Sequence, residues 1–446
     1  MHPKIVTLSG NVVDDWTYKN ADTQYLTHGL HPYPARMIPQ IANRLISDYS
    51  GKEDWILDPF CGSGTVLVES MLKNRNSVGN EINPLAILLT KVKTTPLNEE
   101  IIRKLSKTVL LETTGQILNY RKRGKKGFES ITKWTESDDS QRDFEDIIDT
   151  PKVANLKLWF KDNIIDELAI LRKVILSLDC KQEYRDLFRI CLSFTAMKTS
   201  NADFESHQSH PSRYKPEKLE TFSPDVLSIF REKLNDSIRR VVSFSDKVVD
   251  NEVKCHIISG DARKLDLSEV VPRKIDLIVT SPPYGEEQNT IGYHRWARIM
   301  AYWLGFSNEE MNKSEKLSLG ALSNDEADLP SKTGQYFIDL VEHKSNRKNG
   351  KNRAASLANF FKDYNESIIQ MAKWTKPGAI IAIVVGNRLV AGHRVAMDKV
   401  TVELASESGI THLKTFYRDI PNTIMPKRIP EGETIAKESI IILEKM

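Results

Sequence analysis

The sequence predicts an α/β protein with a doubly wound, Rossmann-like sheet of seven strands and a long helical insertion. Three observations indicate this fold. Seven short apolar runs end in polar or turn residues, a glycine turn joins the first run to a helical pattern, and residues 98–250 show helical spacing alone. The 446 residues, 40% hydrophobic and 28% charged, suffice for one large α/β domain with an insertion or for two to three domains.

The first two predicted strands enclose the glycine turn. Residues 55–57 form a short apolar run, and the segment Asp58-Pro59-Phe60-Cys61-Gly62-Ser63-Gly64-Thr65 leads from it into a helical pattern. The second strand, residues 77–82, contains Glu81, which stands 23 positions after Asp58. An acidic side chain about 20 residues after a glycine turn is placed to hydrogen-bond the hydroxyls of a ribose.

Five further strands complete the predicted sheet, at residues 255–258, 275–279, 379–385, 412–417 and 439–443. Ligands of a doubly wound sheet bind at the carboxyl ends of its strands. Asp58, Glu81 and Asp261 each end or follow a strand, so we expect their carboxylates to converge on one crevice, as an adenosine requires. The turn lacks the Gly-Lys-Ser/Thr ending of a phosphate-binding loop, which favours a nucleoside without a polyphosphate.

The alternation of strands and helices breaks twice. Residues 98–250 are predicted to form a helical insertion, which leaves residues 1–97 and 251–446 as the main domain. Within that domain, residues 307–352 are rich in Ser, Asn, Lys and Glu. Such a composition is typical of an exposed, mobile segment.

The segment Ser281-Pro282-Pro283-Tyr284 comes just after the apolar run 275–279. Two successive prolines fix φ twice and remove two amide donors, so the backbone presents carbonyl acceptors in a stiff geometry. The lone pair of an aromatic amine is delocalised into its ring, which makes the amine a poor nucleophile. Acceptors that take both amine hydrogens, such as a carbonyl and the Ser281 hydroxyl, localise that lone pair, and Tyr284 offers a face on which a base can stack.

With these motifs, the chain resembles the S-adenosylmethionine-dependent DNA amino-methyltransferases, which modify the N4 amine of cytosine or the N6 amine of adenine. The resemblance covers residues 25–97 and 251–446. It includes the segment Thr27 to Pro39, which is similar to the helix start that closes over the methionine end of the cofactor. The resemblance implies a class I methyltransferase sheet, S-adenosylmethionine as cofactor and double-stranded DNA as partner.

The resemblance also implies a set of site residues. The loop from Asp58 to Gly64 is expected to hold the methionine portion of the cofactor, Glu81 the ribose and Asp261 the adenine amine. The implied cofactor-binding residues are Tyr33, Pro34, Asp58, Phe60, Cys61, Gly62, Ser63, Gly64, Thr65, Glu81, Ile82, Asn83, Asp261 and Ala262. The implied catalytic residues are Ser281, Pro282, Pro283 and Tyr284.

Ser281 stands where the adenine enzymes usually carry Asp or Asn, and the resemblance associates Ser with the cytosine enzymes. We therefore expect methylation of cytosine N4 by direct transfer to a base swung out of the duplex. Two alternatives stay open: an N6-adenine DNA methyltransferase, since either side chain can accept an amine hydrogen, and a methyltransferase of an RNA base amine. A non-catalytic nucleic-acid-binding module is disfavoured because the motif is intact.

Two features depart from many relatives. The cofactor loop precedes the catalytic motif, and the insertion lies outside the common positions of a target-recognition domain. The insertion and residues 307–352 are the candidates for DNA contact, together with basic clusters at residues 121–126, 212–216 and 343–353. A cognate restriction endonuclease is the further partner that a restriction-modification system would supply.

Composition limits the other classes of protein. The net charge of +3 does not by itself indicate a polyanionic partner. The N-terminus lacks an apolar signal segment and no run of about 18 apolar residues suggests a membrane span, so we expect a cytoplasmic protein without membrane contact. The cysteines are Cys61, Cys180, Cys191 and Cys255. They predict reduced thiols, and no metal is expected because Cys180, Cys191, His207 and His210 lack the paired spacing of a zinc site.

Overall fold

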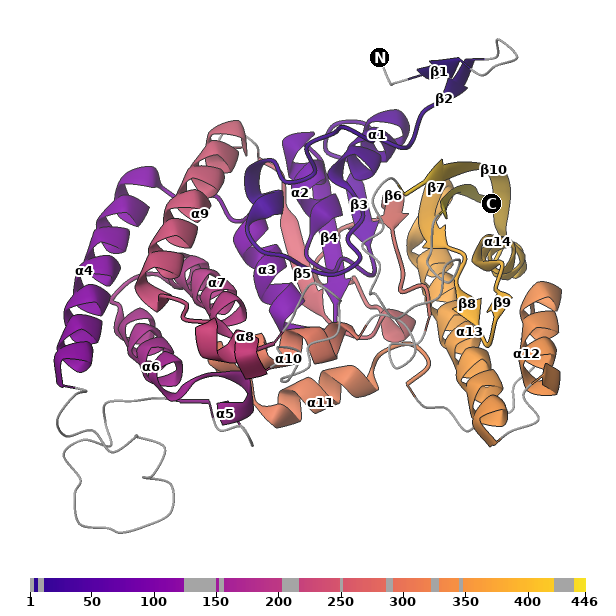
Figure 1. Ribbon diagram of the computed structural model, residues 1–446. Coiled ribbons are helices and arrows are strands. Elements are labelled where there is room, and N and C mark those ends of the chain that lie inside the picture. Colours follow the sequence, from indigo (N-terminus) through magenta and orange to yellow (C-terminus); the bar gives the residue numbers. More distant parts are fainter. Residues whose placement is uncertain are drawn as a thin grey trace.

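The computed structural model describes residues 4–6, 12–123, 150–151, 156–202, 216–248, 252–285, 292–321, 329–344, 348–420 and 437–446. Its centre is a seven-stranded sheet with the strand order β10-β11-β7-β6-β3-β4-β5 (Figure 1). The strands are β3 (Trp55–Asp58), β4 (Asn76–Glu81), β5 (Cys255–Ser259), β6 (Ile275–Thr280), β7 (Thr375–Gly386), β10 (Ile410–Asp419) and β11 (Lys437–Lys445). β11 runs antiparallel to both of its neighbours, and the other neighbouring pairs are parallel. The predicted seven-stranded, Rossmann-like α/β sheet is confirmed.

The central strands are buried on both faces. Ile56 of β3 packs into a core shared with α1 (Pro39–Tyr49) and α2 (Thr65–Leu72). Its neighbours Trp55 and Leu57 pack into a second core shared with α13 (Lys348–Trp374) and α14 (Met397–Glu407). Alternate residues of a strand point to opposite faces, so an apolar run without polar interruptions is what a strand covered by helices on both sides requires.

The helices between β4 and β5 gather at one end of the molecule (Figure 1). They are α3 (Pro84–Thr94), α4 (Glu99–Arg123), α5 (Leu156–Trp159), α6 (Asp162–Ser177), α7 (Gln182–Thr199), α8 (Pro216–Thr221) and α9 (Val226–Val248). Apolar residues of α4, α6, α7 and α9 share one hydrophobic core with α3 and with α10 (Tyr293–Trp303). This helical bundle is therefore joined to the sheet through α3, and α10 reaches it from the segment that follows β6.

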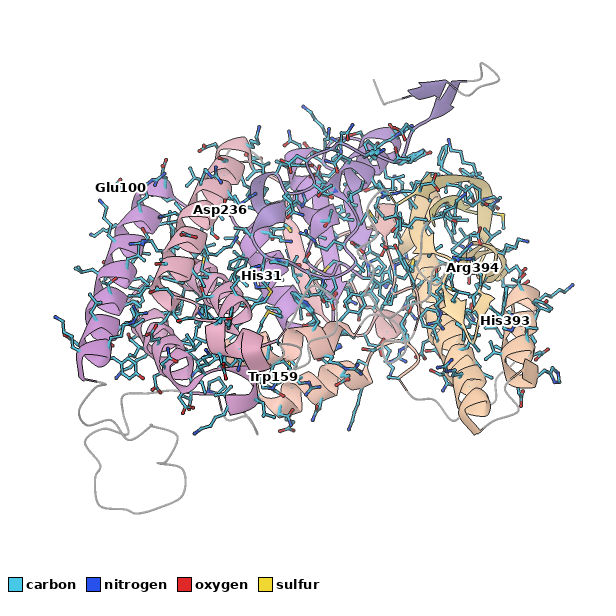
Figure 2. All side chains as sticks on the ribbon, viewed as in Figure 1. His31, Glu100, Trp159, Asp236, His393 and Arg394 are labelled. Atoms are coloured by element: carbon cyan, nitrogen blue, oxygen red, sulfur yellow. The ribbon has the colours of Figure 1, made fainter. Side chains whose placement is uncertain are left out.

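The segment before α1 is fixed between the helical bundle and the sheet. It contains η1 (Leu26–Gly29) and then His31, which is labelled in Figure 2. The Nε2 atom of His31 lies 3.1 Å from the Ser193 hydroxyl of α7. On the other side, Glu69 of α2 accepts a hydrogen bond from the Tyr25 hydroxyl at 2.5 Å and lies 2.7 Å from Nε2 of His28. These contacts hold the segment beside the glycine turn.

The residues between β6 and β7 form α10, α11 (Asn308–Lys316), α12 (Lys332–Lys344) and α13. Ser307 caps α11 in a capping box, and Leu319 is buried in the core shared with α13 and α14. Residues 307–321 therefore include a capped helix with buried apolar side chains, while most residues of α11 are exposed. Residues 322–328 and 345–347 lie outside the described residues.

Smaller elements complete the description. They are the hairpin of β1 (Lys4–Val6) and β2 (Val12–Asp14), the pair β8 (Leu389–Val390) and β9 (His393–Arg394), and η3 (Ala262–Lys264). Within the described ranges, none of the helices has both the length and the apolar character needed to cross a membrane.

Candidate functional site

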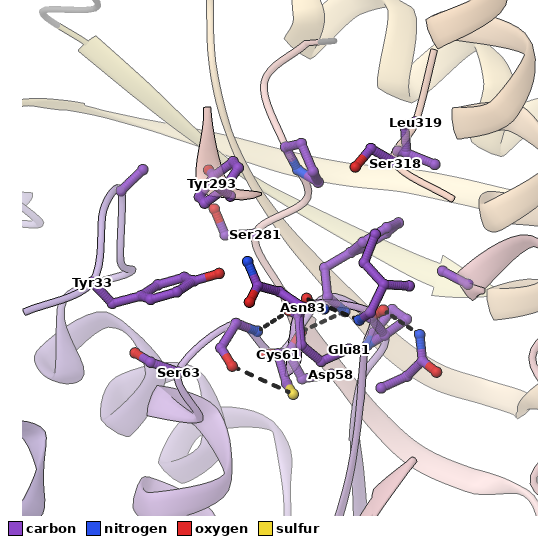
Figure 3. Close-up of a pocket in the computed structure, with 18 of the residues that line it drawn as sticks. Tyr33, Asp58, Cys61, Ser63, Glu81, Asn83, Ser281, Tyr293, Ser318 and Leu319 are labelled. Carbon is purple, nitrogen blue, oxygen red and sulfur yellow. Dashed lines mark hydrogen bonds between the residues drawn. The ribbon is translucent and has the colours of Figure 1, made fainter. Parts of the chain in front are cut away.

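A pocket with about 1000 Å³ of empty space, open to solvent, lies at the carboxyl ends of β3, β4, β5 and β6 (Figure 3). The glycine turn after β3 and Ser281 after β6 line the same pocket, although they are more than 200 residues apart in the chain. Of the residues expected in the site, all but Gly64, Pro282 and Tyr284 line it. The parallel sheet produces this arrangement, because its strands all end at one edge.

The glycine turn follows a path that glycine makes possible. Gly62 has a φ of +51° and Gly64 a φ of +82°, both in the left-handed region. A Cβ atom at Gly64 would lie 2.7 Å from Cγ2 of Thr90, and the Thr90 hydroxyl donates to the Gly62 carbonyl at 2.9 Å. The turn is thus packed closely against α3, and its shape is set before any ligand binds.

Asp58 lies beneath this turn and is 4% exposed. Its Oδ1 atom accepts hydrogen bonds from the Thr280 hydroxyl at 2.7 Å and from the Phe60 amide at 3.1 Å. Burial raises the pKa of Asp58 to about 7, because these two donors do not replace the water that an ionised carboxylate loses. The carboxyl group would gain from a positive charge placed in the pocket.

Glu81 ends β4 and also lines the pocket. Its carboxylate accepts hydrogen bonds from three backbone amides: Gly62 at 2.8 Å, Ile82 at 2.9 Å and Asn83 at 2.8 Å. Burial nevertheless raises its pKa. Since a carboxylate offers about four acceptor positions, roughly one remains for a ligand hydroxyl.

Asp261 follows β5 and is held by its neighbour Arg263. The Arg263 guanidinium donates to both carboxylate oxygens of Asp261, with Nε at 2.9 and 3.0 Å and the terminal nitrogen at 2.8 Å. The same guanidinium binds Asp363 of α13 at 2.8 Å. This bridge fixes the orientation of Asp261 at the pocket wall.

Several buried polar atoms of the pocket lack a hydrogen-bond partner among the described residues. They are the Ser63 hydroxyl, Oδ1 of Asn80 and Nδ2 of Asn83, in side chains that are at most 3% exposed. Leaving a buried donor or acceptor unsatisfied costs about 1–3 kcal/mol. A polar ligand with its own donors and acceptors would satisfy these atoms, so the pocket fits a nucleoside with a charged amino-acid portion such as S-adenosylmethionine.

Ser281 presents its side chain at the pocket, and Tyr284 lies behind it. The Ser281 hydroxyl has two acceptors on its protein side, the Val384 carbonyl at 3.1 Å and the Tyr284 hydroxyl at 3.3 Å. Tyr284 donates to Oε1 of Glu438 at 2.8 Å, and its ring packs against the core shared with α13 and α14. Burial raises the pKa of Tyr284 well above its ordinary value. The stacking face expected of Tyr284 is therefore not part of the pocket lining in this structure.

The pocket also contains residues that the sequence reasoning did not single out. Arg36 lines it, and donates to the His28 carbonyl at 2.7 Å; burial lowers the pKa of Arg36 to about 10. Tyr293 at the start of α10 stacks on Tyr33 with ring centroids 6.0 Å apart. Ser318 closes another side of the pocket. Arg36 belongs to a segment that the resemblance marks, whereas no sequence signal distinguishes Tyr293 or Ser318.

The basic clusters are placed only in part. Arg121 forms ion pairs with Glu167 at 2.7 Å and Asp225 at 3.1 Å, so it joins α4 to α6 and to the start of α9. Residues 124–126, 212–215 and 345–347 of the three clusters lie outside the described residues. Two of the four residues that lack the spacing of a zinc site are placed by the structure: Cys191 is buried and Cys180 is partly buried. The other two, His207 and His210, lie outside the described residues.

The sequence is similar to those of known DNA methyltransferases. A model of the N6/N4 methyltransferases, described as DNA methylase, matches residues 9–91. The Type II methyltransferase M.MvaI of Kocuria varians is 28% identical over 444 residues, which cover 96% of this chain and 92% of that protein. The Type II methyltransferase M.MjaII of Methanocaldococcus jannaschii is 28% identical over 334 residues, covering 60% of each.

A solved TehB-like methyltransferase of Corynebacterium glutamicum aligns with 91% of this chain and 87% of its own at 9% identity. Its TM-score is 0.29.

Proposed function

We propose that this chain, which belongs to the family of S-adenosylmethionine-dependent DNA amino-methyltransferases, methylates the exocyclic N4 amine of cytosine in duplex DNA. The observation that supports the proposal is that the glycine turn and Ser281 open into one pocket. The cofactor is S-adenosylmethionine, which when bound supplies an electrophilic methyl group. A second ligand must then reach that methyl group from the side of Ser281.

The residues proposed to hold the cofactor follow from the pocket. Asp58 and the glycine turn would take the methionine portion, and Arg36 offers a cation to its carboxylate. Glu81 has an acceptor position left for a ribose hydroxyl, and Asp261 is oriented by Arg263 toward the remaining wall. The unsatisfied atoms of Ser63, Asn80 and Asn83 support a polar occupant.

The proposed chemistry needs no covalent intermediate on the protein. A base swung out of the duplex would place its amine at Ser281, where the hydroxyl oxygen and one neighbouring backbone carbonyl accept the two amine hydrogens. Accepting both hydrogens localises the nitrogen lone pair, and holding the amine in line with the methyl group lowers the entropic part of the barrier. In this proposal, the base stacks against the Tyr284 ring when DNA is bound, and the Tyr284 hydroxyl keeps its hydrogen bond to Glu438.

Cytosine is proposed because Ser281 stands at the first position of the motif, where Ser resembles the cytosine enzymes. Adenine N6 and an RNA base amine are the alternatives. The test is to incubate the protein with plasmid DNA, and separately with tRNA and rRNA, using labelled S-adenosylmethionine, and to identify the modified nucleoside by mass. N4-methylcytosine in DNA is the expected product. N6-methyladenine, or label in RNA alone, would replace the proposal by the corresponding alternative.

We further propose that residues 98–250 and 307–352 supply the DNA contacts around the pocket, and that a cognate restriction endonuclease shares the recognition site. Two features support the first of these ideas. The helical bundle packs on α10, which carries Tyr293 into the pocket, and Leu317 to Leu319 follow α11 in the pocket wall. Deleting base pairs from one side of an unmethylated substrate duplex and following methyl transfer would map which part of the DNA is needed.

A further inference from the structure

We infer that Glu438 is a positioning residue that fixes the direction of the Ser281 hydroxyl, so that Ser281 offers the target base only an acceptor and selects an amine over a carbonyl. This inference rests on the proposed function and extends it to a residue outside both motifs. Glu438 does not line the pocket; it acts through Tyr284, whose hydroxyl lies between Glu438 and Ser281.

The topology of the sheet brings Glu438 to the catalytic edge. β6 and β7 are parallel and end there, at Thr280 and Gly386. β11 is antiparallel to β7, so the start of β11 lies where β7 ends, and Glu438 is paired with Gly386. In this register its carboxylate reaches the Tyr284 hydroxyl, 154 positions away in the sequence.

A count of hydrogens shows what Glu438 does. Tyr284 has one hydroxyl hydrogen, and it goes to the Glu438 carboxylate at 2.8 Å. Tyr284 is then only an acceptor for Ser281. The single hydrogen of Ser281 therefore has two acceptors on the protein side, Tyr284 at 3.3 Å and the Val384 carbonyl at 3.1 Å. With either acceptor, the Ser281 oxygen presents lone pairs alone to the pocket.

An ion pair holds the Glu438 carboxylate on the side away from Tyr284. Arg418 of β10 is the register neighbour of Glu438, and its Nε atom lies 3.4 Å from Oε2. The Arg418 side chain is 4% exposed, so its positive charge is held close to the carboxylate with little screening by water. One carboxylate oxygen thus faces the cation and the other faces the Tyr284 hydroxyl.

The consequence concerns base selection. The N4 position of cytosine and the N6 position of adenine each carry two hydrogens, whereas O4 of uracil and O6 of hypoxanthine carry none. An acceptor at Ser281 binds the amines and repels the carbonyls. A hydroxyl that could turn its hydrogen toward the pocket would accommodate both. The Val384 carbonyl and the Tyr284 hydroxyl, which Glu438 keeps as an acceptor, together hold the Ser281 hydrogen away from the pocket and so make Ser281 selective.

The test uses Glu438→Gln, whose amide can donate to Tyr284 and release the Tyr284 hydrogen toward Ser281. The target position is first identified from the DNA that the wild-type protein methylates. Binding is then measured, with saturating S-adenosylhomocysteine, to duplexes carrying cytosine or uracil at that position opposite an abasic site, so that neither base is paired. If the modified base is adenine, hypoxanthine replaces uracil.

The wild-type protein should bind the amine duplex roughly 10-fold or more tightly than the carbonyl duplex, since one hydrogen bond separates them. In Glu438→Gln this ratio should fall by roughly 3-fold or more, because Tyr284 can then donate to Ser281 and take a lone pair that the amine needs, although the Val384 carbonyl remains an acceptor. Methyl transfer should slow by roughly 10-fold. Glu444→Gln removes a carboxylate from the other end of β11 and should keep the wild-type ratio. An unchanged ratio in Glu438→Gln would overturn the inference while leaving the methyltransferase assignment intact.

Tyr284→Phe provides a second test that does not depend on the folding of Glu438→Gln. It removes the relay but keeps the Val384 carbonyl as acceptor for Ser281, so the ratio should fall by a smaller factor. Adding Glu438→Gln to Tyr284→Phe should change the ratio no further, because the phenol that transmits the effect is gone. Additive losses, or a wild-type ratio in Tyr284→Phe, would contradict the inference. Absence of transfer to any DNA by the wild-type protein would defeat the proposed function and the inference together.

Discussion

Replacing Asp58 by Asn should stabilise the cofactor-free protein at alkaline pH and weaken its binding of S-adenosylmethionine. Asp58 is 4% exposed, and within the described ranges its carboxyl accepts hydrogen bonds from the Thr280 hydroxyl and the Phe60 amide. Burial raises its pKa to about 7. Asn keeps the size and the acceptor oxygen for both donors but cannot ionise, so the substitution isolates the charge.

The magnitude follows from the pKa of Asp58. The ordinary pKa of the group is 3.8 and its value in the folded protein is about 7. Between these values the folded protein binds more protons than the unfolded chain, so its stability falls as the pH rises through this window and is constant above it. At about 1.4 kcal/mol per pH unit, the ionised carboxylate costs the folded state up to roughly 4 kcal/mol, of which roughly 3 kcal/mol develops between pH 5 and pH 8.

Cofactor binding should depend on pH with the opposite sign. S-adenosylmethionine carries positive charge on its ammonium and sulfonium groups, and these charges in the pocket favour the ionised form of Asp58. The dissociation constant of the wild-type protein should therefore fall as the pH rises toward about 7 and level off above it. At pH 8, Asp58→Asn should bind roughly 10- to 100-fold more weakly, which is the range for one charge-assisted hydrogen bond.

Two measurements check this reasoning. Urea unfolding without cofactor gives the free energies of unfolding of the wild type and Asp58→Asn at pH 5 and at pH 8. Calorimetric titration gives their dissociation constants for S-adenosylmethionine. Asp246→Asn, which removes an exposed carboxylate on α9, should leave both quantities as in the wild type. The reasoning is refuted if Asp58→Asn shifts the free energy of unfolding equally at the two pH values.

Two further predictions concern the turn and the motif. Ser281→Ala should slow methyl transfer by roughly 10- to 100-fold and leave the dissociation constant of S-adenosylmethionine unchanged, as measured by turnover on DNA and by titration; a wild-type rate would remove Ser281 from the mechanism. Gly64→Ala should lower the free energy of unfolding by about 2–4 kcal/mol, because it combines a left-handed φ with the close contact to Thr90. Gly378 has a φ of +77°, and a Cβ atom there would have no atom within 4 Å. Gly378→Ala should therefore lower the free energy of unfolding by only about 1–2 kcal/mol. Equal losses for the two variants in urea unfolding would mean that the Thr90 contact has no effect.

Much of the sheet could be predicted from the sequence because its strands are buried on both faces. A run such as Ile275 to Val279 contains one polar residue, and that pattern does not depend on the neighbouring strands. The position of β11 between β7 and β10 could not be predicted, since strand order depends on packing between segments far apart in the chain. The order of residues 307–321 was hidden for a related reason: composition favours mobility, while the buried side chains of Met311 and Leu319 anchor the segment.

Some residues of the candidate site could likewise be predicted from the sequence, and others could not. The residues of the glycine turn were predictable, because they lie next to one another and their glycines are needed for positive φ values. The ring of Tyr284 was expected at the pocket, but Tyr284 lies behind Ser281. The partner of its hydroxyl, Glu438, lies 154 positions away, and no local pattern marks it. Tyr293 was missed because an aromatic residue at the start of a helix is ordinary in sequence and becomes part of a site only when α10 packs beside Tyr33.

The residues proposed for cofactor binding and for base selection come from strands of opposite direction. Parallel strands bring the residues at their ends to the pocket, and Asp58, Glu81 and Asp261 all arrive in this way. A residue at the start of a strand can reach the same edge only from an antiparallel strand, and β11 brings Glu438 there. The carboxylates of Asp58 and Glu438 belong to strands of opposite direction and share no hydrogen-bond partner in the described part of the chain. Substitutions at Asp58 should therefore change the affinity for the cofactor, and substitutions at Glu438 should change the selection of the base.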